Sequence, residues 1–183
     1  MSDGFSQPVS KFVSREEDGR MGGTGSHKGR ERRLSATDRC HENNLQYATF
    51  FIEDHFLGIE VLKVQEVLTF QAMTRVPLAP QVIAGLINLR GQIVMAIDLR
   101  ARLGFSPYSE GMTPMSVVVQ TQDGAMSLLV DRIWDVIEVK PDLFEPPPEM
   151  LNERMREMTV GVYKLKDRLL IALDTETVTQ VVG

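Results

Sequence analysis

The sequence is organised around the stretch Gly85-Leu86-Ile87-Asn88-Leu89-Arg90-Gly91-Gln92-Ile93-Val94-Met95-Ala96-Ile97-Asp98-Leu99, two apolar runs on either side of the polar pair Arg90-Gly91. Apolar residues at nearly every position are typical of strands buried on both faces. A glycine supplies the positive φ that a tight reversal requires, so the stretch predicts a β-hairpin with Arg90 at its tip. An arginine adds nothing to turn geometry, but its five-donor guanidinium suits carboxylates on a partner. The alternative is a solvated turn residue.

The same pattern recurs near the end of the chain without a gap. Gly85–Asp98 aligns with Gly161–Asp174 at a constant offset of 76 residues. Four pairs are identical: Gly85/Gly161, Leu89/Leu165, Ala96/Ala172 and Asp98/Asp174. Such self-similarity indicates the duplication of a small β unit. We expect a mainly β fold of two similar five-stranded barrels with short helices, over about 45–110 and 111–183, whose ends cross over.

Local signals predict the remaining elements. Strands are expected over the following apolar runs: Gln46–Ile52, Phe56–Val61, about Val64 to Leu68, Ser116–Gln120, Ala125–Val130 and Ile133–Val139. The Asp123-Gly124 pair predicts a hairpin turn between two of these runs. Short helices are expected at Gln81–Ala84, opened by Pro80, and at Leu99–Leu103, closed by Gly104. Asp98 and Asp174, which follow strands, are expected to cap short helices and not to form an acid–base pair.

Composition restricts the class of protein. The chain has 183 residues, is 43% hydrophobic and carries a net charge of −5. A chain of this length and hydrophobic content can bury a stable core without a metal ion or a disulfide. Cys40 has no partner within the chain, and neither an apolar leader nor an 18-residue apolar span occurs, so we expect a soluble cytoplasmic protein. The acidic balance argues against binding to a phosphate backbone. Protein partners are therefore expected, without cofactor or nucleic acid.

The first 44 residues have few large apolar side chains and predict a disordered polar tail. The basic run Lys28–Arg33 is interrupted by Glu31 and has no neighbouring aromatic residue, so we interpret it as part of a solvated tail. Cys40, His41 and the other two histidines show no paired-ligand spacing. No metal site is expected.

Several of these motifs together resemble the CheW family of chemotaxis coupling proteins. The resemblance covers about Leu45 to Val182 and is carried by Gly58–Val67, Gly85–Leu99, the Asp-Gly hairpin with Val130-Asp131, and Gly161–Ala172. It implies SH3-like barrels and a non-enzymatic adaptor that joins the cytoplasmic hairpin tip of methyl-accepting chemoreceptors to the regulatory domain of the chemotaxis histidine kinase. No kinase or receiver domain accompanies these motifs, so a free-standing coupling protein is expected.

The resemblance also implies where the partners bind. The groove between the barrels would take the receptor tip, and the barrel ends would meet the kinase domain and build rings beneath the membrane array. The implied protein-binding residues are Val64, Glu66, Asn88, Leu89, Arg90, Gly91 and Ile93. A surface-sensing or pilus pathway is an alternative to chemotaxis. A small β-barrel enzyme or nucleic-acid binder is the alternative of another class, and it would need a pocket of titratable groups or exposed aromatics beside a basic groove.

The sequence leaves the structural role of three features open. Trp134 fits packing at the core or a sheet edge, but a tryptophan at an edge is also a suitable anchor for a partner. Met150–Met158 fits a loop or frayed helix. Met95 stands where the family pattern leads us to expect proline, and the helix after Asp174 is short, which leaves the closure of the first barrel open.

Overall fold

The computed structural model describes residues 44–69, 71–109 and 111–181, which belong to the second of two units, Met1–Arg39 and Cys40–Gly183. The expected disordered tail, with Cys40, His41 and the basic run, lies outside the described residues. In chain order the elements are β1 (Leu45–Ile52), β2 (His55–Glu60), the 3₁₀ helix η3 (Val61–Lys63), β3 (Val64–Leu68), β4 (Ile83–Leu89), β5 (Gln92–Asp98), α1 (Leu99–Leu103), β6 (Met115–Thr121), β7 (Gly124–Val130), β8 (Arg132–Val139), the 3₁₀ helix η4 (Pro141–Leu143), β9 (Phe144–Glu145), α2 (Glu153–Glu157), β10 (Thr159–Lys164), β11 (Leu169–Leu173) and α3 (Thr175–Thr179).

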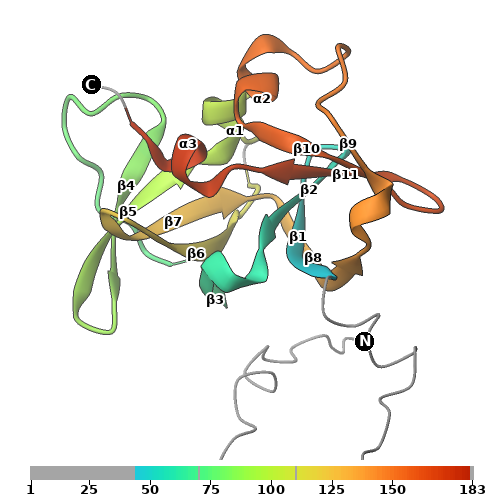
Figure 1. The fold of residues 1–183 in the computed structure, drawn as a ribbon. Helices are drawn as coiled ribbons and strands as arrows, with labels where there is room; N and C mark the ends of the chain where they lie inside the picture. Colours follow the sequence, from blue (N-terminus) through green and yellow to red (C-terminus); the bar gives the residue numbers. More distant parts are fainter. Residues whose placement is uncertain (1–43, 70, 110, 182–183) are drawn as a thin grey trace, which may run out of the picture. The chain divides into compact units, whose positions relative to one another are not determined.

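The strands form two sheets. One has six strands in the order β8-β1-β2-β11-β10-β9, and the other has five in the order β3-β6-β7-β5-β4. In Figure 1 the cyan strands β1 and β2, from the start of the described chain, lie among orange and red strands from its end. The expectation of a mainly β fold with two related sheets and a few short helices is confirmed.

Each sheet combines the two halves of the chain. The first hairpin of each half pairs with two elements of the other half. It pairs antiparallel with the third strand, as β1–β8 and β6–β3, and parallel with the last hairpin, as β2–β11 and β7–β5. Four of the five residues of β11 are buried, so this strand needs neighbours on both sides, and β2 is one of them. Each sheet therefore contains strands from before and after residue 110, and the expected domain bounds stay a prediction.

The duplication extends to the details of the pairing. Ala96 faces Ser127 in one parallel pair, and its counterpart Ala172, 76 residues later, faces Gly58 in the other. Hairpins β4–β5 and β10–β11 have matching register shifts, and each is followed by a five-residue helix. Asp98 caps α1 by accepting from the Ala101 N–H, and Asp174 caps α3 by accepting from the N–H groups of Glu176 and Thr177. The expected capping roles are confirmed.

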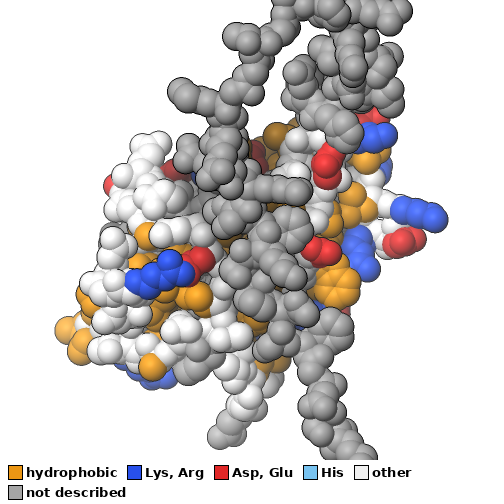
Figure 2. Space-filling view, turned by 90° about the horizontal axis from the view of Figure 1, so that it is seen from below, with side chains coloured by type: hydrophobic (Ala, Val, Ile, Leu, Met, Phe, Trp, Pro, Cys, Tyr) orange, Lys and Arg blue, Asp and Glu red, His pale blue; other side chains and the backbone are white. Residues whose placement is uncertain are grey.

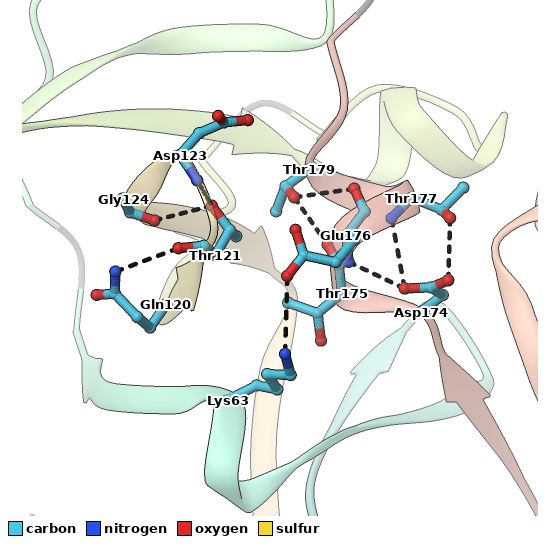
Figure 3. A network of polar contacts seen from close by, with 10 residues as sticks. All are labelled: Lys63, Gln120, Thr121, Asp123, Gly124, Asp174, Thr175, Glu176, Thr177 and Thr179. Atoms are coloured by element: carbon cyan, nitrogen blue, oxygen red, sulfur yellow. Dashed lines mark hydrogen bonds and ion pairs between the residues drawn. The ribbon is translucent and has the colours of Figure 1, made fainter.

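Helix α3 is also held to the segment that precedes β3. Figure 3 shows Lys63 pointing from η3 toward Glu176 of α3, with 3.7 Å between the ammonium and the carboxylate. On the same helix, the Thr179 hydroxyl donates to backbone carbonyls of the preceding turn. The ion pair therefore ties the helix to η3, and the Thr179 hydroxyl stabilises the last turn of the helix itself.

The main hydrophobic core draws on both sheets and on all three helices. Its fully buried members include Phe50 and Ile59 of the six-stranded sheet and Leu128 of the five-stranded sheet, with Val178 of α3. Two smaller clusters lie within one sheet each, around Tyr163 and around Val94 and their neighbours. The two sheets consequently share a core and are not independent barrels.

One predicted helix is wrong. Gln81–Ala84 forms a single turn, in which Ile83 N donates to Pro80 O at 2.9 Å, and β4 begins at Ile83 itself. Asp98 N donates to Val82 O at 2.8 Å, which draws this segment onto the hairpin before a second helical turn forms. Met150–Met158 contains the short helix α2, whose Met155 is buried. No helix among the described residues is long and apolar enough to cross a membrane.

The repeated glycines Gly85 and Gly161 admit close backbone neighbours. A Cβ on Gly85 would lie 2.6 Å from Thr74 O, and one on Gly161 would lie 2.7 Å from Glu145 O and closer still to the Phe144 ring. Thr74 bridges Leu86 of β4, and Glu145 pairs with the corresponding Val162 of β10. The same constraint therefore explains the identity of this residue in both copies.

We expect Gly85→Ala and Gly161→Ala each to lower the free energy of unfolding by about 2 kcal/mol, because the backbone carbonyls must shift to admit a methyl group. Val160→Ala, at an exposed position of β10, is the control and should change it by less than about 0.5 kcal/mol. Urea denaturation measures all three. Glycine variants as stable as the control would contradict the close approach.

Candidate protein-interaction site

The β4–β5 hairpin ends in a tight turn at Arg90 and Gly91. Both residues have positive φ, 51° and 89°, as the two central residues of a type I′ turn must. Gly91 N donates to Asn88 Oδ1 at 2.9 Å and closes the turn. The sequence predicted positive φ only for Gly91. An arginine in this left-handed region costs about 1 kcal/mol, a cost that no buried contact of Arg90 offsets.

Arg90 pairs with Glu66 of β3. Arg90 Nη2 donates to Glu66 Oε2 at 2.9 Å, and the arginine side chain is 82% exposed while the glutamate side chain is 15% exposed. β3 and β4 stand at opposite ends of the strand order, so the ion pair links the first and last strands of the sheet. The half-buried carboxylate orients the guanidinium, whose remaining donors face solvent.

The other predicted residues divide into an exposed and a packed group. Asn88 and Gly91 are exposed, and Ile93 is 67% exposed beside the turn. Leu89 is buried in the small core cluster of this sheet, and Val64 is half-buried against the main core. A register shift separates Val64 from Glu66, so the two do not present equivalent faces of β3. The structure thus brings Glu66 and Arg90 together, with Ile93 as the exposed apolar neighbour on the hairpin.

Two exposed leucines were not singled out by the sequence. Leu78, in the loop between β3 and β4, has a φ of 63° and is fully exposed, and Leu62 of η3 is 93% exposed. Figure 2 shows hydrophobic side chains interspersed with single basic and acidic ones on one face of the described residues. Pro77 and Pro80 marked the loop as irregular, but no sequence pattern distinguishes an exposed loop leucine from a packed one.

A second ion pair is buried and structural. Arg100 of α1 is 6% exposed, and its Nε and Nη2 donate to the two carboxylate oxygens of Asp131 at 2.7 and 2.6 Å. These hydrogen bonds raise the pKa of the guanidinium above its ordinary value. Asp131 also accepts from Glu53 N, and Arg100 Nη1 donates to Ser106 O. The pair therefore joins the β1–β2 turn to the link between β7 and β8.

The two aspartates that could have formed an acid–base pair serve as helix caps. Asp98 and Asp174 accept the N–H groups at the starts of α1 and α3, and burial raises the pKa of the Asp98 carboxyl while backbone hydrogen bonds oppose that shift. Within the described part of the chain, no group of three histidine, cysteine or acidic side chains is placed to hold a metal ion. Trp134 is 52% exposed at the edge strand β8.

An open pocket of about 250 Å³ lies where β5 and β7 meet the end of the chain. Its lining consists of Met95, Asp123, Met126, Thr179, Gln180 and Val181. Met95, which stands where a proline was expected, thus lines a surface hollow beside the parallel strand pair. The sequence did not indicate this pocket.

These features define a class of protein: a doubled β-sheet domain with a rigid hairpin that carries an exposed, internally paired arginine, as suits a protein-contact surface. Similarity to known proteins supports this class. The model of the CheW-like domain family matches residues 46–182. The chain belongs to the CheW-like family.

Known relatives share most of the described chain. The chemotaxis protein CheW of Helicobacter pylori is 30% identical over 151 residues, which are 81% of this chain and 91% of that protein. A probable chemotaxis protein CheW of Rhizobium etli is 27% identical over 141 residues, which are 77% of this chain and 91% of that protein. The crystal structure of the scaffolding protein TtCheW from Thermoanaerobacter tengcongensis aligns with a TM-score of 0.68 at 26% identity, over 75% of this chain and 94% of that one.

The two ion pairs should differ in their effect on stability. Asp131→Asn removes the two short hydrogen bonds to the buried Arg100 and leaves it only the longer contact to Glu53, at 3.4 Å. It should lower the free energy of unfolding by about 3 kcal/mol. Glu66→Gln removes the partner of an exposed arginine and should cost less than about 1 kcal/mol. Thermal and urea denaturation of both variants test this. Equal losses would contradict the division into a structural and a surface pair.

Proposed function

We propose that this protein is a chemotaxis scaffold that joins the cytoplasmic hairpin tip of chemoreceptors to the regulatory domain of the chemotaxis histidine kinase. It acts in the cytoplasm, beneath receptor arrays, by binding alone and without catalysis. The observation that carries the proposal is the Arg90–Glu66 pair at the tip of the β4–β5 hairpin, which is exposed on the arginine side and fixed on the glutamate side.

The geometry of this pair suits recognition of a helical partner. Glu66 engages only one Nη group of Arg90, so the guanidinium keeps further donors for a partner. A guanidinium binds carboxylates in a defined, planar geometry. Ile93 provides an exposed apolar contact on the next strand. Charged groups around an apolar residue give specificity and a rapid encounter more than affinity, which suits a scaffold that must assemble with defined partners.

We propose Glu66, Arg90, Asn88, Gly91 and Ile93 as contact residues, with Val64 and Leu89 supporting them from the core side. Two sheets with a shared core offer separate faces, so that a receptor and a kinase domain bind together and the complexes extend into rings. A nucleic-acid binder is less well supported, because the chain has a net charge of −5 and phosphate binding favours a basic surface. A related surface-sensing pathway would use the same contacts with other receptors.

Charge reversal at the pair tests the proposed site. Arg90→Glu and Glu66→Arg should each weaken binding to a purified receptor hairpin fragment by about tenfold, since each loses one charged contact and brings like charges together. The double reversal restores the internal ion pair but presents the opposite charge to the partner. It should therefore remain stable and still bind weakly.

Lys164→Glu is the matched control, because Lys164 forms an exposed ion pair with Glu145 at 2.7 Å on the other sheet. It should bind the receptor fragment as the unaltered chain does. Isothermal titration calorimetry gives the affinities, and denaturation confirms that the variants are folded. Full recovery of binding by the double reversal would assign the pair a purely structural role and refute the site.

A further inference from the structure

A second group of charged and aromatic side chains lies on the six-stranded sheet, which does not carry Glu66 and Arg90. This group, called here the arginine–aromatic cluster, consists of Phe51 of β1, Phe56 of β2, Arg132 and Trp134 of β8, and Arg168 just before β11. Figure 2 shows hydrophobic side chains beside basic ones on the described residues. Because β8 is an edge strand, a partner can approach the cluster without displacing a described strand.

The aromatic rings support both arginines. Phe51 packs against Phe56 with ring centroids 5.1 Å apart and meets Trp134 edge-on at 5.8 Å. The Arg132 guanidinium lies 4.4 Å from the Phe51 centroid, and that of Arg168 lies 5.0 Å from the Phe56 centroid. Both are also 5.8 Å from the Trp134 centroid. Such stacking orients a guanidinium while leaving its edge donors free.

The other copy of the repeat shows that the fold does not require this cluster. First-hairpin and third-strand residues correspond at an offset of 69, and last-hairpin residues at 76. The counterparts of Phe51, Phe56, Arg132, Trp134 and Arg168 are Gln120, Ala125, Lys63, Gln65 and Gln92. Three amides, an alanine and a single lysine therefore occupy these positions in the other copy, whereas the six-stranded sheet exposes a tryptophan and two stacked arginines.

The two arginines of the cluster, Arg132 and Arg168, have no ion-pair partner within the described part of the chain. By contrast, Arg90 has Glu66, Arg100 has Asp131 and Lys164 has Glu145. Two oriented cations, each 5.8 Å from the centroid of the half-exposed Trp134 ring, are complementary to carboxylates that flank an apolar side chain.

We infer that the arginine–aromatic cluster is a second protein-interaction surface, and that its occupant is an acidic segment of a partner protein with an apolar residue between its carboxylates. The apolar residue packs on Trp134, and the carboxylates bind Arg132 and Arg168. Two cations are fewer than the four to eight basic residues that typically hold a protein on an anionic membrane. This surface is independent of the Arg90 site, so either can fail without the other.

The chain contains a single tryptophan, so tryptophan emission reports on the cluster directly. The probe is a short peptide in which glutamates alternate with leucines, titrated into the full chain. We expect a saturable blue shift of the emission. Arg132→Gln with Arg168→Gln should raise the dissociation constant by about tenfold, whereas Lys166→Gln, which removes a nearby positive charge outside the cluster, should leave it within about twofold.

A peptide with glutamine in place of glutamate separates charge recognition from simple apolar contact and should bind at least about tenfold more weakly. The inference is overturned if both peptides shift the emission equally, or if neither does. It is also overturned if phosphatidylglycerol vesicles bind where the acidic peptide does not. An emission that shifts with protein concentration would show that a second copy of the chain covers the cluster, and would also overturn the inference. An emission that is blue-shifted before peptide is added, and that peptide does not change, would assign the cluster to another segment of this chain.

Discussion

The structure depends on the parallel pairing of β2 with β11 and of β5 with β7, because these two contacts place the first hairpin of each half in the sheet of the other. Neither sheet is complete without residues from both halves. The Arg100–Asp131 pair reinforces this exchange, since it ties α1 and the start of β8 to the β1–β2 turn. Folding of the two sheets is therefore coupled, and a partner bound to one sheet acts on a body that includes the other.

The duplication gives the protein two equivalent positions at which function can diverge. At the tip of β4–β5 the turn carries Arg90, paired with Glu66 of the facing edge strand. On the other sheet, Trp134 and Arg168 stand where the other copy has Gln65 and Gln92. Stacked arginines lie there without an ion pair among the described residues. A scaffold needs separate surfaces for separate partners, and divergence of two copies on one shared core provides them while the strand pairing stays the same.

Much of the fold was predictable because its signals are local. The β4–β5 and β6–β7 hairpins follow from apolar runs around Arg90-Gly91 and Asp123-Gly124, and the offset of 76 residues predicted that Asp98 and Asp174 would have the same capping role. The exchange of hairpins is a long-range pairing that no local pattern specifies, so the strand order of the two sheets could not be predicted from the sequence. The helix expected after Pro80 was wrong because backbone bonding to β5 overrides local propensity.

The candidate site was predictable in part for the same reason. Glu66 and Arg90 were singled out by the family motifs, and the structure brings them into contact at 2.9 Å, whereas the half-burial of Val64 depends on tertiary packing. The central claim, that this protein holds two partners at once, is tested most directly by sedimentation velocity of the chain mixed with a receptor hairpin fragment and the kinase regulatory domain. The account predicts one species containing all three components. Two binary complexes that exclude each other would contradict it.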